Sequence, residues 1–104
     1  MHHHMKCDIY MENDIYYIEA DIPGYNKQDI KVHYNDNNLI ISAQKVINNR
    51  HYLIHERYRN HLSRSFYLQN IDVDLIEAKY ENGVLYIVAP LKKECNEKKK
   101  IEIK

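Results

Sequence analysis

The sequence predicts an all-β fold, an immunoglobulin-like antiparallel β-sandwich of seven or eight short strands. Three observations support this prediction. The 104 residues include ten tyrosines but only two glycines and two prolines, and aromatic and β-branched residues favour strands. Apolar and polar residues alternate in short runs, as they do on half-buried strands. Turn signals separate these runs at intervals of about 8 to 12 residues, which is typical of sandwiches rather than closed barrels.

Size, charge and cysteine content narrow the class of protein. The chain is long enough for one domain with two packed layers. Fifteen basic residues balance fifteen acidic ones, so bulk charge favours neither nucleic acid nor a membrane as a partner. No apolar run reaches the ~18 residues that span a bilayer, and no signal peptide is evident. Cys7 and Cys95 lie far apart, which indicates a reducing compartment. We therefore expect a cytoplasmic protein.

The first well-marked strand begins at Ile15. Apolar and polar residues alternate from there to Ile22, which predicts a strand with one buried face. Pro23-Gly24 ends it, because proline cannot donate to a sheet and glycine accepts the positive φ of a tight turn.

A hairpin follows this turn. Ile30, Val32 and Tyr34 alternate with polar residues and predict its first strand. The turn formers Asn35 to Asn38 come next, and the apolar run from Leu39 to Ser42 predicts the returning strand. We therefore expect a hairpin with a four-residue connection.

The middle of the chain predicts a loop and then a strand. Gln44 to Arg50 has no periodicity, and a short strand at Tyr52 to Arg57 would project from this loop. The next strand runs from Leu62 to Leu68, with Arg64 in its inward phase. An inward arginine needs a partner, for which we expect a carboxylate; a position at the rim of a twisted edge is the alternative.

The last strands form a second hairpin. Ile71 to Asp74 connects to them with about one helical turn. Ile76, Ala78 and Tyr80 share one face of a strand, and Asn82-Gly83 turns the chain. The apolar run from Val84 to Ala89 completes the hairpin and ends at Pro90.

Two isoleucines stand apart in the charged tail. Ile101 and Ile103 would point to one face of an extended segment, but the stretch from Lys92 to Lys100 gives them nothing local to pack against. Strand-like peptides dock on sheets by such alternate side chains, so the tail predicts an interaction element. It could add an edge strand to its own subunit or, since about ten residues span roughly 30 Å, reach another subunit.

Chemical motifs are absent. His51 and His55 have the spacing of a metal pair, but no third ligand is evident. Neither cysteine has a neighbouring histidine, and no serine, aspartate and histidine form a recognisable catalytic motif. We expect neither an enzyme nor a bound metal or cofactor.

The order of short motifs resembles the alpha-crystallin domain of small heat-shock proteins. Six motifs match in sequence: Ala20-Asp21-Ile22-Pro23-Gly24, Asp29-Ile30-Lys31-Val32, Leu39-Ile40-Ile41, Glu56-Arg57 with Arg64 and Phe66, Ala78 with Asn82-Gly83-Val84-Leu85, and Ile101-Glu102-Ile103. Three positions depart from the family pattern, Ala43, Asn60 and Gln69, all in expected turns or strand ends. On this resemblance residues 7–91 are the domain and 92–104 a C-terminal extension. Residues 1–6, with His2-His3-His4, are expected to be a tag or a remnant N-terminal arm.

The resemblance implies an ATP-independent holdase chaperone that binds partly unfolded client proteins and limits their aggregation. A co-chaperone or adaptor domain of the CS type, which binds a folded partner, is the alternative. That class generally lacks both the long loop and the terminal I-x-I motif.

The resemblance also implies how the chain assembles with itself. In a homodimer, the loop strand of one subunit would pair with the first strand of the other, roughly Met5 to Met11. The residues of the loop strand are Tyr52, Leu53, Ile54, His55, Glu56 and Arg57. Ile101 and Ile103 would dock in a groove lined by Ile30, Val32, Ile76 and Ala78, and such docking would link dimers into larger oligomers. Arg64 would be a structural charge.

Overall fold

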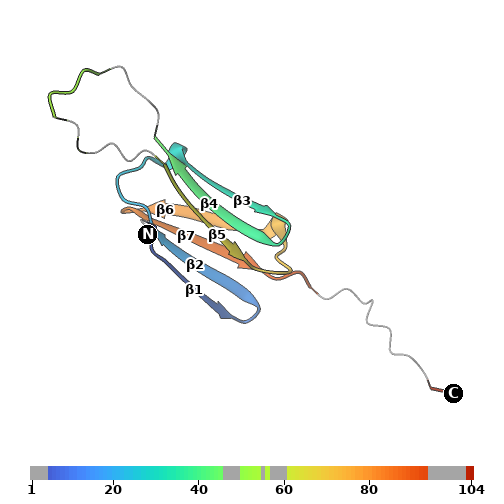
Figure 1. Cartoon of the computed structure of the whole chain (residues 1–104). Coiled ribbons are helices and arrows are strands. Elements are labelled where there is room, and N and C mark those ends of the chain that lie inside the picture. Colours follow the sequence, from blue (N-terminus) through green and yellow to red (C-terminus); the bar gives the residue numbers. More distant parts are fainter. Residues whose placement is uncertain (1–4, 46–49, 55, 57–60, 94–102) are drawn as a thin grey trace.

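The computed structural model describes residues 5–45, 50–54, 56, 61–93 and 103–104. These residues form seven strands in two antiparallel sheets, which lie face to face (Figure 1). Besides the strands, the described residues contain two short 3-10 turns and no α-helix. The predicted all-β sandwich is thereby confirmed.

The two sheets have four and three strands. The larger sheet has the order β1 (Cys7–Glu12), β2 (Ile15–Asp21), β7 (Val84–Pro90), β6 (Glu77–Glu81). The smaller sheet has the order β3 (Ile30–Asn35), β4 (Asn38–Gln44), β5 (His61–Tyr67). The 3-10 turns η1 (Lys27–Asp29) and η2 (Val73–Leu75) lie directly before β3 and β6.

Two-residue turns join the hairpins. The expected four-residue connection at Asn35 to Asn38 is wrong, because both end residues pair within their strands and only Asp36 and Asn37 remain in the turn. These two residues have φ of 51° and 64°, as a type I′ turn requires, and this turn matches the twist of paired strands. In the last hairpin Gly83 also has positive φ, and a Cβ there would lie 3.4 Å from the backbone of Pro23.

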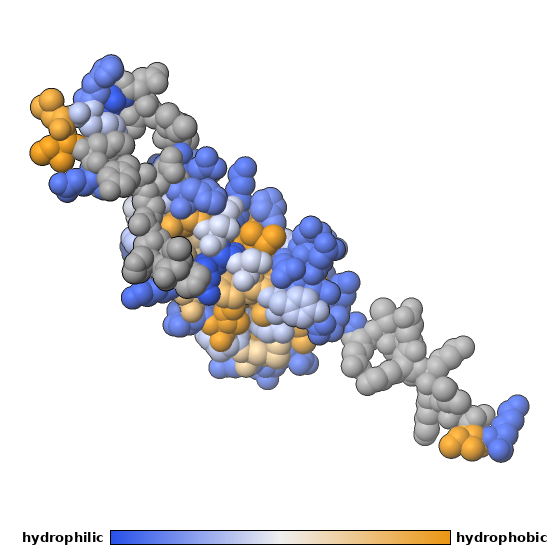
Figure 2. All heavy atoms as spheres, viewed as in Figure 1, coloured by the Kyte–Doolittle hydropathy of each residue, from blue (hydrophilic) through white to orange (hydrophobic). Residues whose placement is uncertain are grey.

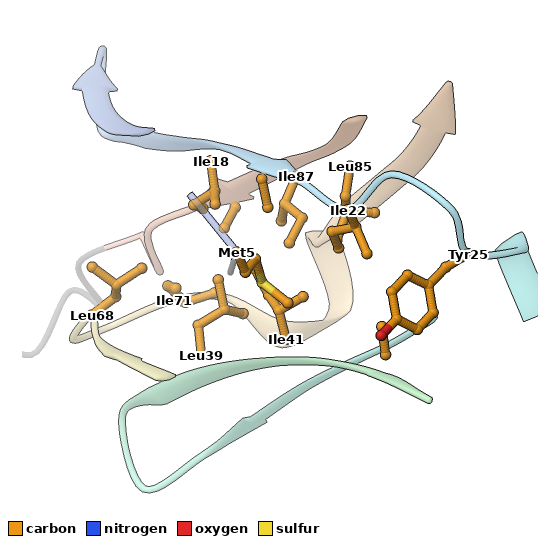
Figure 3. Packing of buried hydrophobic residues seen from close by; sticks show 13 residues of the cluster. Met5, Ile18, Ile22, Tyr25, Leu39, Ile41, Leu68, Ile71, Leu85 and Ile87 are labelled. Carbon is orange, nitrogen blue, oxygen red and sulfur yellow. The ribbon is translucent and has the colours of Figure 1, made fainter. Parts of the chain in front are cut away.

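The core lies between the sheets and is built mainly by the central strands β2, β4 and β7 (Figure 3). Every second residue of β4 and β7 is buried, and in β2 the same phase holds the buried Ile18 and Ala20 and the half-buried Tyr16, as the alternation predicted. Their buried side chains are Ile18, Ala20, Leu39, Ile41, Ala43, Leu85, Ile87 and Ala89. Each of the large aliphatic side chains stabilises the fold by ~1.5 to 3 kcal/mol.

Met5 is also part of this core. Its side chain is 1% exposed and lies between the two layers (Figure 3). The carbonyl of Lys6 accepts a hydrogen bond from the Asp21 amide at 2.9 Å. The packed region therefore includes two residues that precede the expected start of the domain at Cys7.

Two crossovers carry the chain from one sheet to the other. The first, residues 22–29, leads from β2 to β3, and the second, residues 68–76, leads from β5 to β6. Both are anchored by fully buried isoleucines, Ile22 and Ile71. The Ile22 amide donates to the Gly83 carbonyl at 2.8 Å, and Ile71 forms a bridge with Leu91. Each crossover thus contributes to the core and enters an edge strand.

The long loop and the tail leave the sandwich at opposite ends (Figure 1). The loop begins after Gln44 and returns at His61, which pair with each other. The tail begins after Leu91, whose amide donates to the Asp14 carbonyl at the other end of the sheet. The points at which the loop and the tail begin therefore lie at opposite ends of the sandwich.

Tyr25 gives a test of the packing. Its ring is 8% exposed, and within the described residues its hydroxyl has no hydrogen-bond partner. Because an unpaired buried hydroxyl costs free energy, Tyr25→Phe should raise the free energy of unfolding by about 1 kcal/mol in urea denaturation. Tyr80→Phe is the matched control, since the hydroxyl of Tyr80 is paired, and it should lower the same quantity by about 1 kcal/mol.

The same variant should change the alkaline limit of stability. Burial, and secondarily the charge of Asp29, raise the pKa of Tyr25 above its ordinary value. The folded state therefore favours the neutral hydroxyl over the phenolate, and this preference has no effect on stability below about pH 10, where the hydroxyl is neutral in both states. Stability is lost as pH rises from there through the folded-state pKa. The advantage of Tyr25→Phe should thus grow above pH 10. A constant difference between the two proteins at pH 8 and pH 11 would contradict this.

Candidate functional site

Four edge strands are the candidate sites of interaction, because each has backbone groups on one side with no strand partner in the described chain. They are β1 and β6 in the larger sheet and β3 and β5 in the smaller sheet. Hydrogen bonds described below place β3 beside the crossover into β6, and β5 beside the residues that enter β1. The sandwich therefore has two open sides, a β3/β6 margin and a β1/β5 margin.

Three of the four residues expected in the tail-binding groove are half-buried on the β3/β6 margin. Ile30 and Val32 pair with buried residues of β4 and so face the core, and both pack against it. Ile76 lies directly before β6 and also packs against the core. All three keep part of their surface exposed.

Ala78, the fourth expected groove residue, faces the core side of its strand and is nevertheless exposed. It pairs with the buried Ile87 and therefore lies on the core-facing side of β6, yet its side chain is exposed. A core-facing alanine can be exposed only where the opposite layer does not cover it. The structure thus brings the four expected groove residues to the core-facing sides of two edge strands, with apolar surface uncovered between them.

One tyrosine completes the core-facing row on each strand, Tyr34 on β3 and Tyr80 on β6. The Tyr34 hydroxyl donates to the Leu68 carbonyl at 2.6 Å and accepts from the Ile71 amide at 3.4 Å. The Tyr80 hydroxyl lies 2.6 Å from the Ile22 carbonyl and 3.0 Å from the Tyr25 carbonyl. Sequence analysis placed both tyrosines in phase with the groove residues but missed these contacts. A tyrosine on the inward phase of a strand was the available signal, since its buried hydroxyl needs a partner.

Arg64 lies on the opposite margin and in the predicted inward phase, since it pairs with the buried Ile41. The expected carboxylate partner is wrong for the part of the chain that the structure describes. The Arg64 guanidinium instead donates to the carbonyl of Met5 at 2.9 Å and lies 4.8 Å from the centre of the Phe66 ring. A carbonyl and an aromatic face thus take the place of an ion pair.

Cys7 is next to this contact. Its thiol donates weakly to the same Met5 carbonyl at 3.8 Å. Burial raises the pKa of the thiol above its ordinary value, and the charge of Arg64 offsets this only in part. The thiol is therefore a poor nucleophile at neutral pH.

Two apolar residues of the expected loop strand are strongly exposed. Leu53 is 102% exposed and Ile54 is 76% exposed, and apolar atoms are visible at the tip of the loop (Figure 2). Residues 50–54 and 56 form no strand in the single chain, whereas His55 and Arg57 lie outside the described residues. The expected partner strand, β1, also exposes Tyr10 and Met11.

The described end of the tail carries one exposed isoleucine. Ile103 is 97% exposed, and apolar atoms are visible at the C-terminal end of the chain (Figure 2). Ile101 lies outside the described residues. In the described part of the tail, an isoleucine that the sequence predicts to dock is therefore fully accessible.

A comparison with protein families identifies the chain. A sequence model of the Hsp20/alpha crystallin family matches residues 8–104, nearly the whole chain. The chain belongs to the Hsp20/alpha crystallin family. The resemblance inferred from the six short motifs is thereby confirmed, and with it the alpha-crystallin type of β-sandwich.

Individual members of the family are similar over most of this chain. Small heat shock protein C2 of Rickettsia felis is 38% identical over 95% of this chain and 67% of its own length. The 18 kDa heat shock protein of Clostridium acetobutylicum is 38% identical over 84% of this chain and 62% of its own. Heat shock protein HSP.16.4 of Streptococcus thermophilus is 35% identical over 95% and 72%. The chain therefore spans about two thirds of the length of these relatives.

Solved structures agree with this assignment. Heat shock protein 16.0 of Schizosaccharomyces pombe has a TM-score of 0.69 and 29% identity, over 96% of this chain and 97% of that one. A small heat-shock protein of Xylella fastidiosa has a TM-score of 0.70 and 27% identity, over 96% and 95%. Members of the family are chaperones, not enzymes. No helix in the described residues is long and apolar enough to cross a membrane.

The Arg64 contact should stabilise the fold and hold the N-terminal residues in place. In a Cys95→Ser background, Arg64→Ala should lower the free energy of unfolding by about 1.5 to 3 kcal/mol, because it removes a hydrogen bond from a charged group. Loss of the Arg64 charge raises the pKa of the Cys7 thiol further, but the reaction of this thiol with a disulfide reagent at pH 7.5 should still be faster, because Met5 loses an anchor and the half-buried thiol becomes accessible. Lys79→Ala, which removes an exposed ion pair with Glu81, should change stability by less than 1 kcal/mol. Unchanged melting and thiol reactivity in Arg64→Ala would show that Arg64 does not hold the N-terminal residues.

Proposed function

We propose that this protein is an ATP-independent holdase that binds partly unfolded proteins through its exposed apolar edges. The observation that carries the proposal is the exposure of large apolar side chains on an edge strand and a projecting loop in a member of a chaperone family. Large aliphatic groups such as Leu53 and Ile54 gain free energy when a client's apolar surface covers them. Binding of this kind needs no chemical step and hence no nucleotide.

A strand-swapped dimer would supply the partner that the loop strand lacks. Residues 52–57 of one subunit would pair with β1 of the other and add a fifth strand to the larger sheet. Tyr10 and Met11 are 45% and 44% exposed, and because they are consecutive they offer apolar surface on both faces of β1. Leu53 and Ile54 offer the same on the loop. Pairing would satisfy two exposed edges at once.

Docking of the tail would cover the β3/β6 margin. The margin has uncovered aliphatic surface at Ile30, Val32, Ile76 and Ala78, and the small Ala78 leaves room for an isoleucine. Burial of Ile101 and Ile103 would contribute ~1.5 to 3 kcal/mol each, less the cost of ordering the linker. A single tail would therefore bind weakly, and many tails in one oligomer would bind firmly. The Xylella fastidiosa protein is described as having a distinct high order structure, which supports assembly of this kind.

The holdase proposal is tested by light scattering. When a heat-labile client is warmed without nucleotide, a several-fold excess of this protein should suppress scattering. Leu53→Asp together with Ile54→Asp should weaken the suppression, because charged side chains cannot replace the apolar contacts. Full suppression by the double variant would show that the loop does not carry client binding or the active dimer. No suppression by the parent protein would reject the holdase role.

Tail docking is tested by the mass of the protein in solution. Ile101→Ser together with Ile103→Ser should abolish species larger than a dimer and leave the dimer intact, since the domain core is unchanged. Lys98→Ser together with Lys100→Ser changes the same segment without removing aliphatic groups and should keep the larger species. Identical mass distributions for the parent and the isoleucine variant, measured by light scattering after size-exclusion chromatography, would reject tail docking.

A further inference from the structure

The β3/β6 margin has the same pattern of side chains on both of its strands. Each presents three core-facing positions in a row, two aliphatic and one aromatic. On β3 these are Ile30, Val32 and Tyr34. On the other side they are Ile76, Ala78 and Tyr80. A docked strand would therefore meet two aliphatic positions and one tyrosine along either wall.

The two tyrosines lie at opposite ends of the margin. Tyr80 bonds to the crossover 22–29, which enters β3 just before Ile30. Tyr34 bonds to the crossover 68–76, which enters β6 through Ile76. The aromatic end of each wall therefore faces the aliphatic end of the other, so that each end of the margin has one tyrosine and one crossover.

Hydrogen bonds fix both rings in these places. Each hydroxyl contacts two backbone groups of the crossover that feeds the opposite strand, with shortest distances of 2.6 Å in both cases. Each crossover is anchored in the core by a fully buried isoleucine, Ile22 or Ile71, and an unpaired tyrosine hydroxyl beside it would be costly. The two tyrosines therefore tie the edge of one sheet to the connection of the other and hold the ends of the margin at a set separation.

From the positions of these two rings we infer that Tyr34 and Tyr80 limit how many side chains of a docked strand the margin can bury. Two aliphatic side chains at positions i and i+2 fit between the rings, and a third at i+4 does not. The inference rests on the proposed role of the margin as a docking groove. Alternate side chains of a strand are ~6.6 to 7 Å apart. The two tyrosines stand at opposite ends of rows of three such positions, about two of these steps apart, so that one pair of side chains fits between the rings. The next side chain on the same face would meet a tyrosine ring. Ile101-Glu102-Ile103 has the predicted pattern, and the lysines on either side supply no third apolar group.

Two peptides test this selectivity on the full chain. The host protein carries Ile101→Ser and Ile103→Ser, so that its own tail does not compete. One peptide has the sequence of residues 96–104, and the other has isoleucine in place of Lys99 and so offers three alternate isoleucines. The measured quantity is the ratio of their dissociation constants, obtained by fluorescence anisotropy. For the host protein we expect the third isoleucine to give no gain in affinity.

Removal of a tyrosine ring from one end of the margin should change the ratio of the two dissociation constants. In Tyr34→Ala or Tyr80→Ala, the three-isoleucine peptide should bind about tenfold tighter than the two-isoleucine peptide, because the third side chain can then be buried. The end that responds also reports the direction of the docked strand. Tyr86→Ala is the matched control: Tyr86 is half-buried on the outer face of β7 beside Lys79, and the ratio should not change there.

Failure of the docking groove and failure of the tyrosines to limit the docked segment give different results. If the host protein binds neither peptide, the docking groove itself is rejected. If it binds the two-isoleucine peptide but the ratio stays the same in both alanine variants, or already favours the longer motif in the host, the tyrosines do not set the length. Should an alanine variant fail to fold by circular dichroism, Tyr34→Phe and Tyr80→Phe decide. Loss of the hydroxyl anchor should then shift the ratio about threefold toward the longer motif, and an unchanged ratio rejects the inference.

Discussion

The fold depends on how two small sheets cover the core between them. In the described chain the sheets have four and three strands, and each ends in an edge strand on both sides. The central strands bury their inward side chains almost completely, whereas the inward side chains of the edge strands extend past the opposite layer. The surfaces on which a loop strand or a tail could dock lie on those edges. The two open sides differ in how far the chain itself covers them.

The β1/β5 margin is partly covered by the chain itself. Met5 inserts between the layers before β1 begins, and its carbonyl is held by Arg64 from β5. This contact brings a charged group to the core boundary without a buried ion pair, whose desolvation would be costly. The other side is left partly uncovered, and only its ends are fixed, by Tyr34 and Tyr80. The same two crossovers are anchored in the core through Ile22 and Ile71, so the ends of the uncovered margin are tied to the core.

The sequence predicts strands and faces better than neighbours and partners. Alternation shows which side chains point inward, and this gave the two hairpins and the inward position of Arg64. It does not show which strand lies beside which, so the place of β7 between β2 and β6 could not be derived. A backbone carbonyl is present at every residue and leaves no mark in the sequence, which is why the partner of Arg64 was missed. Met5 was missed because a single apolar residue after a histidine run has no periodicity. Residues 50–54 and 56 form no strand in the single chain, and the alternation of residues does not show with which edge a strand there would pair.

Exposed apolar edges raise the question of why such a protein does not aggregate by edge-to-edge pairing. The outward side chains of the margin answer it. On β6 these are Glu77, Lys79 and Glu81, and on β3 they include Lys31 and His33, all of them exposed. A strand that paired with either edge would have to place its own side chains beside these charges, and charged edges oppose indefinite growth of a sheet. The inward face of the same strands carries no charge at the docking positions. An isolated aliphatic pair can therefore bind there, while extended pairing along the whole edge is disfavoured.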